Sequence, residues 1–156
     1  MKNSSQNVYT DSFYIDSTST FANITSQVKN FIKKVKFRNG LAVIFTQHTT
    51  AGIRLLEEER LLIEDLEHFL ERFAPSYVQY KHDNISARNV PDHERINGYS
   101  HLRSFYSNTS EVIPVVEGQL QMGPWQSIIF IDFDKGRRRR VLTMLIGGNG
   151  AQEKSG

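Results

Sequence analysis

The sequence has no cysteine, so the chain forms neither a disulfide nor a metal site with thiolate ligands. It also has no apolar run close to the roughly 20 residues that a helix needs to cross a bilayer. Its first seven residues are polar and lead into no apolar signal core. These absences predict a cytoplasmic protein with no membrane partner.

Charge of one sign is not in large excess, because the formal net charge is only +2. This value is too small to indicate a nucleic-acid-binding protein, so nucleic acid is not an expected partner. The positive charge is uneven, however, and forms two clusters: Lys33, Lys34, Lys36 and Arg38, and the four arginines from Arg137 to Arg140. Each cluster is either a solvated face or an anion site, and composition alone does not separate the two.

The 156 residues are predicted to form one domain, because this length is typical of a single hydrophobic core. The hydrophobic fraction of 38% and the charged fraction of 23% are ordinary for a globular protein. Tails at residues 1–7 and 147–156 are rich in Gly, Ser, Asn and Gln and are predicted to fray. A small domain with an open sheet often completes its core by association.

The hydrophobic pattern predicts an α+β fold. A first helix begins at Asn23 or Thr25, a second and stronger one ends before Pro75, and a short third one covers residues 98–106. Strands are expected at residues 8–15, 41–45, 112–116, 125–133 and 139–146. Tight turns join the last three strands, which predicts a mainly antiparallel sheet with the two main helices on one side. Residues 76–96 read as a long polar connection, and such connections are usually functional or disordered.

Three histidines are candidates for chemistry. His48 directly follows a predicted strand and is flanked by hydroxyl and small residues, so its ring can lie at a sheet edge, or it can simply bond neighbouring threonines. His82 lies in the long polar connection and His101 on the short third helix. Three neutral imidazoles from separate segments could hold zinc or a similar metal, although no local metal-binding spacing is present. His68 and His93 are predicted to be surface residues.

Glu57 and Asp65 are the candidate acids. Glu57 is a possible general base or metal ligand, or it favours the positive end of the second helix together with its acidic neighbours. Asp65 either faces the site or is a surface charge. Sequence reasoning leaves both pairs of alternatives open.

Two further features have two interpretations each. Trp125 is either a core residue or a surface that stacks on a flat heterocycle. The arginines from Arg137 to Arg140 begin a strand, so alternate ones point to opposite faces, and one pair could grip phosphates unless the run is a solvated rim. No phosphate-binding loop, dinucleotide fingerprint or nucleophile elbow occurs, so serine-based covalent chemistry has no support.

Taken in order, short motifs along nearly the whole chain resemble the YjbQ-like family, also called the secondary thiamine-phosphate synthase family. The motifs are Phe21-Ala22-Asn23-Ile24-Thr25, His48-Thr49-Thr50-Ala51, Glu57, Asp65-Leu66-Glu67, Tyr80-Lys81-His82, Ser100-His101-Leu102, Pro114-Val115-Val116-Glu117-Gly118, Gly123-Pro124-Trp125-Gln126 and Arg137-Arg138-Arg139-Arg140-Val141.

This resemblance implies an α+β homotrimer with a polar site near subunit edges. It also implies a weak thiamine-phosphate synthase activity, which joins a hydroxymethylpyrimidine pyrophosphate to a thiazole phosphate and expels pyrophosphate. By position, the resemblance assigns His48, His82 and His101 to the polar centre of the site, with a possible zinc or magnesium ion. Glu57 and Asp65 would assist the histidines, and Trp125 and Gln126 would line the wall of the site. Arg137 or Arg139 would contact phosphate.

The chain departs from the family pattern in two places. Leu56 stands where the family often has asparagine, and the stretch between His82 and His101 is longer than in the shorter members. The additional residues, 89–95, could form a lid or reshape the pocket.

Three functions follow as alternatives. The first is a metal-assisted transferase acting on a phosphorylated small molecule. The second is a non-catalytic trimeric binding protein for a phosphate-bearing ligand or an RNA, and the third is a structural trimer with a vestigial pocket. RNA is the weaker form of the second, because no aromatic residue is interleaved with Arg137 to Arg140.

Overall fold

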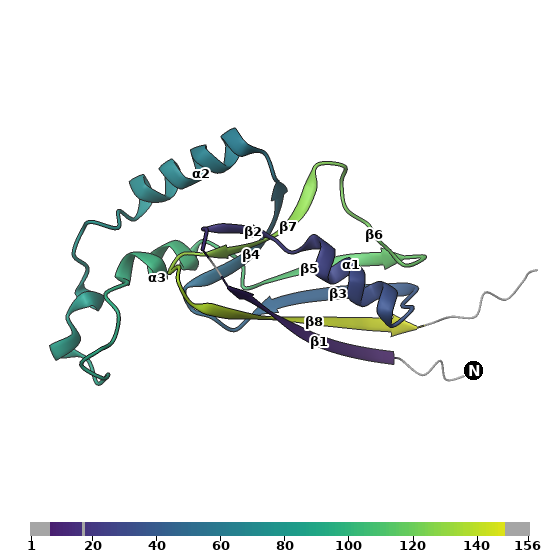
Figure 1. Cartoon of the computed structure of the whole chain (residues 1–156), viewed down its shortest axis with the longest axis horizontal. Helices are drawn as coiled ribbons and strands as arrows, with labels where there is room; N and C mark the ends of the chain where they lie inside the picture. Colours follow the sequence, from purple (N-terminus) through teal and green to yellow (C-terminus); the bar gives the residue numbers. More distant parts are fainter. Residues whose placement is uncertain (1–6, 17, 149–156) are drawn as a thin grey trace, which may run out of the picture.

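The structure, a computed structural model, describes residues 7–16 and 18–148 (Figure 1). Within these residues the elements are, in chain order, β1 (Asn7–Asp16), β2 (Phe21–Asn23), α1 (Thr25–Lys34), β3 (Asn39–Thr46), β4 (Ala51–Glu57), α2 (Arg60–Phe73), η1 (Lys81–Asp83), η2 (Ile85–Ala87), α3 (Gly98–Phe105), β5 (Ser110–Val116), β6 (Gln119–Leu120), β7 (Gln126–Asp132) and β8 (Arg138–Gly148). All strand pairs are antiparallel, which confirms the predicted α+β class.

The strands form two sheets rather than one. A five-stranded sheet has the order β1-β8-β3-β5-β6, and a three-stranded sheet has the order β2-β7-β4. The three-stranded sheet lies over one face of the larger sheet, and α2 lies beyond it (Figure 1). Both main helices are therefore on the same side of the five-stranded sheet, as predicted, but a second sheet lies between α2 and the first.

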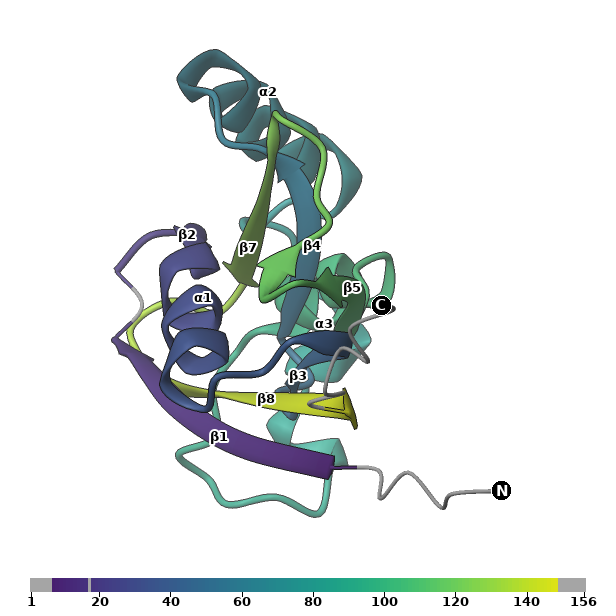
Figure 2. The same ribbon diagram turned by 90° about the vertical axis from the view of Figure 1, so that its right-hand side faces the viewer.

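The main hydrophobic core fills the space between the two sheets and α1, which lies beside both of them (Figure 2). It combines three side chains of α1, and Ile24 just before that helix, with inward-facing residues of both sheets. The buried members are Ile24, Val28, Phe31, Ile32, Phe37, Ala42, Ile44, Ala51, Ile53, Ile113, Val115, Ile128, Phe130, Val141 and Leu145. A smaller core of Ile129, Ile131 and Phe133 lies on the other face of the three-stranded sheet, under Leu70 of α2.

The first helix is anchored to the sheet at its N-terminus. The Asn23 side chain accepts a hydrogen bond from the backbone N–H of Thr25 at 2.9 Å, which satisfies one of the free donors of the first turn. The Thr25 hydroxyl accepts from the backbone N–H of Ile128 at 2.8 Å and so ties the helix to β7. The N-cap position itself is Ile24, between the two residues predicted as possible caps.

The second helix is capped by Glu59, whose carboxylate accepts from the backbone N–H groups of Leu61 and Leu62, each at 2.9 Å. These bonds hold the pKa of Glu59 below its ordinary value. At the other end, Glu71 pairs with Arg103 of α3 at 2.6 Å, and the Arg103 Nε donates to the carbonyl of Ala74 at 3.0 Å. None of the α2 side chains is fully buried, so capping and this ion pair hold a helix that covers its sheet only partly.

The strands β2, β4 and β6 are not predicted from the sequence. With three residues, β2 is too short to show a periodic pattern. In β4, Ile53 and Leu55 pack in the main core and Leu56 packs in the smaller one. A strand covered on both faces lacks the alternation that identifies a half-buried strand.

The tails predicted to fray lie mostly outside the described residues. Asn7, Gly147 and Gly148 are described, and they belong to β1 and β8. Across residues 7–16 and 18–148, the helices are all too short or too polar to span a bilayer.

Candidate functional site

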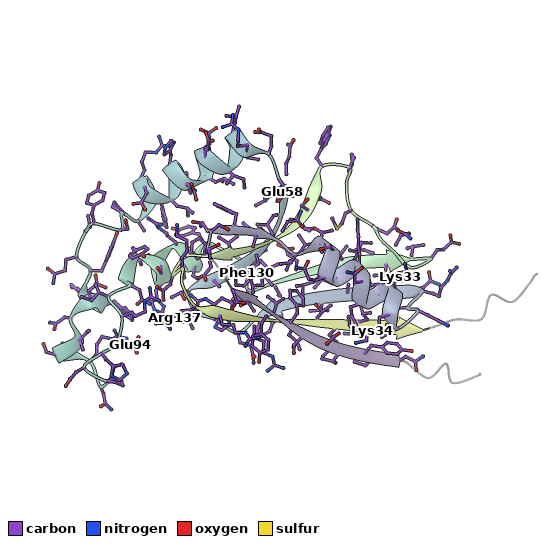
Figure 3. All side chains as sticks on the ribbon, viewed as in Figure 1. Lys33, Lys34, Glu58, Glu94, Phe130 and Arg137 are labelled. Carbon is purple, nitrogen blue, oxygen red and sulfur yellow. The ribbon has the colours of Figure 1, made fainter. Side chains whose placement is uncertain are left out.

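A polar cavity of about 330 Å³ lies at the end of the five-stranded sheet where β3 ends and β8 begins. Segments far apart in the sequence meet there: the β3–β4 turn, the loop before α3, α3 itself and the start of β8. Figure 3 shows Glu94 and Arg137 together at this end of the molecule. The lining residues are Gln47, His48, Thr49, Thr50, Arg88, Glu94, Asn97, His101, Arg137 and Arg139.

His48 is fixed by a backbone hydrogen bond. The N–H of Arg140 donates to Nε2 of His48 at 2.9 Å, so Nε2 carries no proton and a neutral ring holds its proton on Nδ1. Burial lowers the pKa of His48, and Arg139 and Arg137 lower it further, while Asp132 acts in the opposite direction. His48 is therefore a neutral hydrogen-bond donor near pH 7.

Arg139 belongs to the wall of the cavity and forms a buried ion pair. Its side chain is only 3% exposed and that of Asp132 is not exposed at all. The Arg139 Nε and Nη2 donate to the two carboxylate oxygens of Asp132 at 2.8 and 2.6 Å, and Nη2 also donates to the carbonyl of Asp134 at 2.7 Å. This forked pair holds the β7–β8 connection in place and uses most donors of Arg139.

The other arginines of the run have different surroundings. Arg137 is 40% exposed, lines the cavity and contacts Asp134 at 3.4 Å through Nε. Arg138 lies over the ring of Tyr14, with its guanidinium carbon 4.3 Å from the ring centroid. Arg137 is therefore the member of the run that is best placed to reach a ligand in the cavity.

His101 and His82 are neighbours, with ring centroids 4.4 Å apart. Burial lowers the pKa of His101, and His82 and Arg88 act in the same direction, whereas Asp134 and Glu94 raise it. The Nε2 atom of His82 is buried and makes no hydrogen bond within the described part of the chain. The pair therefore includes one polar atom that a water or ligand could satisfy.

The long polar connection is ordered by contacts at both of its ends. Asp83 is buried and accepts hydrogen bonds from the backbone N–H groups of Tyr80 and Gly98, each at 2.8 Å. Near the other end, the Asn97 amide donates to Asp134 at 3.0 Å, and Arg95 contacts the same carboxylate at 3.2 Å. These contacts bring Arg88 and Glu94 to the cavity.

The donor set of the described residues does not fit the predicted three-histidine metal site. Within residues 7–16 and 18–148, no three His, Cys, Asp or Glu side chains lie close enough together to hold an ion. His82 and His101 are adjacent, but His48 uses Nε2 to accept from Arg140. Zinc or magnesium as a cofactor stays a prediction.

Four other predicted site residues lie away from this cavity in the chain. Glu57 ends β4 opposite Gln126, and at about 3.3 Å per residue this end is roughly 20 Å from Ala51 beside the cavity. Asp65 is exposed on α2, and Trp125 is 73% exposed in the loop before β7. Because β4 runs away from His48, Glu57, Asp65, Trp125 and Gln126 do not line the His48 cavity of the same chain. Their roles stay predictions.

Several residues of the cavity were missed by sequence reasoning. Gln47, Arg88, Glu94 and Asn97 line it. Asp132 and Asp134 do not line it but set its charge from behind the wall. The signal for these two was present: acidic residues flank the end of an apolar strand, three and five residues before an arginine run across a tight turn.

Comparison with known proteins places the chain in a family. The family profile described as "UPF0047 protein YjbQ-like" matches residues 11–148. A UPF0047 protein of Archaeoglobus fulgidus is 37% identical over 76% of this chain and 85% of that protein, and UPF0047 protein YjbQ of Escherichia coli O157:H7 is 32% identical over 80% and 86%.

Solved structures agree with this relation. A YbjQ-like protein of unknown function from Sulfolobus solfataricus P2 superposes with a TM-score of 0.81 at 30% identity, covering 91% of this chain and 99% of that one. A hypothetical protein from Aeropyrum pernix K1 gives 0.79 at 31% identity, covering 90% and 99%. The chain therefore belongs to the YjbQ-like family, UPF0047.

Proposed function

We propose that the His48 cavity binds the phosphate group of a small phosphorylated molecule. The observation that carries this proposal is the set of donors that line the described cavity: Arg88 and Arg137 are matched there by one lining carboxylate, Glu94, while Arg139 is paired with Asp132 behind the wall. His48 and His101 add neutral N–H donors, because their lowered pKa values keep both rings uncharged near pH 7. Fixed donors of this kind select an oxyanion.

Within this proposal the residues have separate roles. Arg137 contacts the phosphate, because Arg139 is already engaged with Asp132. His48 donates from Nδ1, and the threonine hydroxyls of the β3–β4 turn add further donors. Arg139 acts as a positioning residue that holds the turn carrying Arg137.

We further propose that the bound molecule is the pyrophosphate substrate of a thiamine-phosphate synthase-type transfer, as the resemblance to the family implies. The ring nitrogen of the thiazole phosphate attacks the methylene carbon of the pyrimidine substrate. The carbon–oxygen bond to pyrophosphate breaks, and pyrophosphate leaves with the electron pair. Arg137 and the imidazole N–H donors would stabilise the charge that develops on this leaving group.

A non-catalytic binding role is the second candidate, and one observation favours it. Glu57, the predicted general base, lies at the far end of β4, so Glu94 is the carboxylate left to manage protons at the cavity. Both candidate functions include binding of a phosphate group in the cavity, and only the transferase would convert its ligand to product.

The test measures affinity for inorganic pyrophosphate by calorimetry, and thiamine phosphate formation from the two substrates. Arg137→Gln is expected to weaken pyrophosphate binding by roughly 10- to 100-fold, as for loss of a charge-assisted hydrogen bond. Arg138→Gln is the matched control, since the side chain of Arg138 lies over Tyr14 and does not line the cavity. This variant should bind pyrophosphate as wild type does. Equal affinities in all three proteins would refute the phosphate site, whereas binding without turnover would leave the second candidate.

We also propose that the chain forms a homotrimer through the outer face of the five-stranded sheet. The strand register gathers apolar side chains on this face in rows across four strands. They are Val8, Leu41, Val43, Phe45, Val112, Pro114, Leu142, Met144 and Ile146. Leu41 and Val112 are 43% and 53% exposed, and a continuous apolar face of this kind is typical of an interface.

Sedimentation tests this assembly. Wild type is expected at three times the 18.0 kDa mass of the chain, and Val112→Glu, which places a charge on the β5 side of the face beside Val43, at the monomer mass. Ile96→Glu changes another exposed apolar residue, outside the sheet, and should leave the trimer intact. A monomeric wild type would overturn the proposal.

A further inference from the structure

A second concave surface lies at the opposite end of the five-stranded sheet, between α1 and the β5–β6 turn. Its volume is about 670 Å³. Figure 3 shows Lys33 at this end, far from Arg137. We call it the lysine hollow, and its lining residues are Lys29, Asn30, Ile32, Lys33, Lys36, Phe37, Arg38, Glu117, Gly118, Gln119 and Leu120.

The cations of the hollow are not neutralised by the protein. Lys29, Lys33, Lys36 and Arg38 line it, and within residues 7–16 and 18–148 none of them forms an ion pair. The neighbouring Lys34 does form one, with Asp11 at 3.6 Å, and does not line the hollow. Four unpaired cations therefore surround one acid, Glu117, in a concave space.

Stabilisation of the helix end accounts for only part of this arrangement. Cations in the last turn of a helix favour its negative end, which explains Lys33 and Lys34. It does not explain Lys29, which lies one turn earlier, four residues before Lys33, where two like charges repel. Nor does it explain Arg38, which lies beyond the helix.

Backbone conformation adds a second, independent observation. Lys36 has φ +53° directly after the helix cap Val35, and its N–H donates to the carbonyl of Lys33 at 3.2 Å. Glycine usually occupies this position, because it adopts the left-handed conformation without strain. Here the chain keeps a cationic side chain at a position where glycine would be more stable.

The facing turn shows the same feature. Glu117 has φ +52° and Gly118 has φ +80°, the combination of a two-residue hairpin turn in which Asn, Asp or Gly normally comes first. The two charged residues held in left-handed backbone thus both line the hollow. Strain that persists at a site is typical of function rather than of stability.

We propose that the lysine hollow binds a chain of two or more phosphate groups, as in a diphosphate or triphosphate moiety, independently of the His48 cavity. With four cations and Glu117 the hollow has a net charge of +3, so a single phosphate group, at about −1.5 to −2, would leave at least one positive charge unbalanced. A chain of phosphates matches four cations spread over residues 29–38. Glu117 provides an acceptor for a hydroxyl or amino group on the same ligand.

The hollow favours a compact polyphosphate over a single-stranded nucleic acid. Nucleic-acid grooves combine cations with exposed aromatic rings on which bases stack. The aromatic residue here, Phe37, is 1% exposed and packs in the main core. No stacking surface is therefore present among the lining residues.

The experiment uses inorganic tripolyphosphate and orthophosphate as probes, in full-length protein carrying Arg137→Gln so that the first cavity does not contribute. Amide NMR signals of residues 29–38 and 117–120 are expected to shift with tripolyphosphate at lower concentration than with orthophosphate. Lys33→Gln should weaken tripolyphosphate binding at least about fivefold. Lys34→Gln, the adjacent control, should not.

Lys36→Gly gives a second readout. Removing the left-handed lysine should raise Tm by about 2–4 °C while tripolyphosphate affinity falls. Unchanged affinity in Lys36→Gly, or equal losses in Lys33→Gln and Lys34→Gln, would overturn the site. Tighter binding of a single-stranded oligonucleotide than of tripolyphosphate, lost in Lys33→Gln, would overturn it in favour of a nucleic acid. These outcomes are independent of the Arg137 test, so the two proposals can fail separately.

Discussion

The two clusters of positive charge lie at opposite ends of one sheet, and their surroundings differ sharply. At the arginine end, Asp132 at the end of β7 and Asp134 in the connection that follows contact the cations, and Arg139 is buried in a forked ion pair. At the lysine end, within the described residues, Glu117 is the one acid that lines the hollow and the cations stay unpaired. A run of cations therefore has no fixed role. Carboxylates from other segments decide whether its members form structural ion pairs or stay available to bind an anion.

The chemistry of the two side chains suits this division. A planar guanidinium with several donors can hold a carboxylate, a backbone carbonyl and a hydroxyl at once, as Arg139 does. An ammonium on a flexible stem is a point charge that can follow a mobile anion. The arginine end is therefore expected to be rigid and the lysine end adaptable.

The largest expected effect comes from breaking the buried pair. Arg139→Met leaves Asp132 buried without a partner and should lower the free energy of unfolding by about 3–5 kcal/mol. Arg138→Met, one residue away on the exposed side, should cost less than about 1 kcal/mol. Urea denaturation of both variants measures the difference, and equal losses would show that Arg139 is not the structural member of the run.

Changing the pH should affect the arginine end, where both shifted histidines lie. The folded-state pKa values of His48 and His101 are below their ordinary value of 6.5, so the unfolded chain binds more protons as pH falls past this value. The free energy of unfolding should therefore fall between pH 7 and pH 5.5. Urea denaturation across this range should give a flatter profile for the double variant His48→Gln/His101→Gln, and an unchanged slope would contradict the assignment.

The smallest expected effect lies at the lysine end. Lys29 and Lys33 are like charges one helical turn apart, so Lys29→Gln should raise the free energy of unfolding by roughly 0.2–0.5 kcal/mol at low salt. The gain should vanish near 1 M salt, where charges are screened within about 3 Å. Denaturation at two salt concentrations measures this. A gain that persists in high salt would have another cause than repulsion between the cations of the hollow.

The helices were predictable because each carries a strong apolar stripe. Residues such as Val28 and Ile32, or Leu66 and Leu70, recur at helical spacing, and the structure has helices at both places. The division into two sheets was not predictable, because β4 is short and its last residues, Leu55-Leu56-Glu57, resemble the start of the helix that follows. Strand partners are set by long-range packing, which local patterns do not report.

The site was predictable only in part. His48 and His101 follow or lie on predicted elements and do line one cavity. Glu57 seemed close to them along the sequence, but an extended strand carries it away at more than twice the rise per residue of a helix. The sequence prediction puts Glu57 near the start of a helix, whereas it is the last residue of β4. This difference explains why Glu57 was expected near His48.

The strand order of the larger sheet also has a consequence for folding. The strand β8 lies between β1 and β3, and its register joins Asn7 to Gly147. Neither neighbour can complete its ladder before the last strand has left the ribosome, so this sheet forms only after synthesis has passed residue 148. Contacts of such large sequence separation slow folding, because a long loop must close before they form. Until then β1 and β3 lack a strand partner on one edge, and unpaired strand edges of this kind are prone to aggregate.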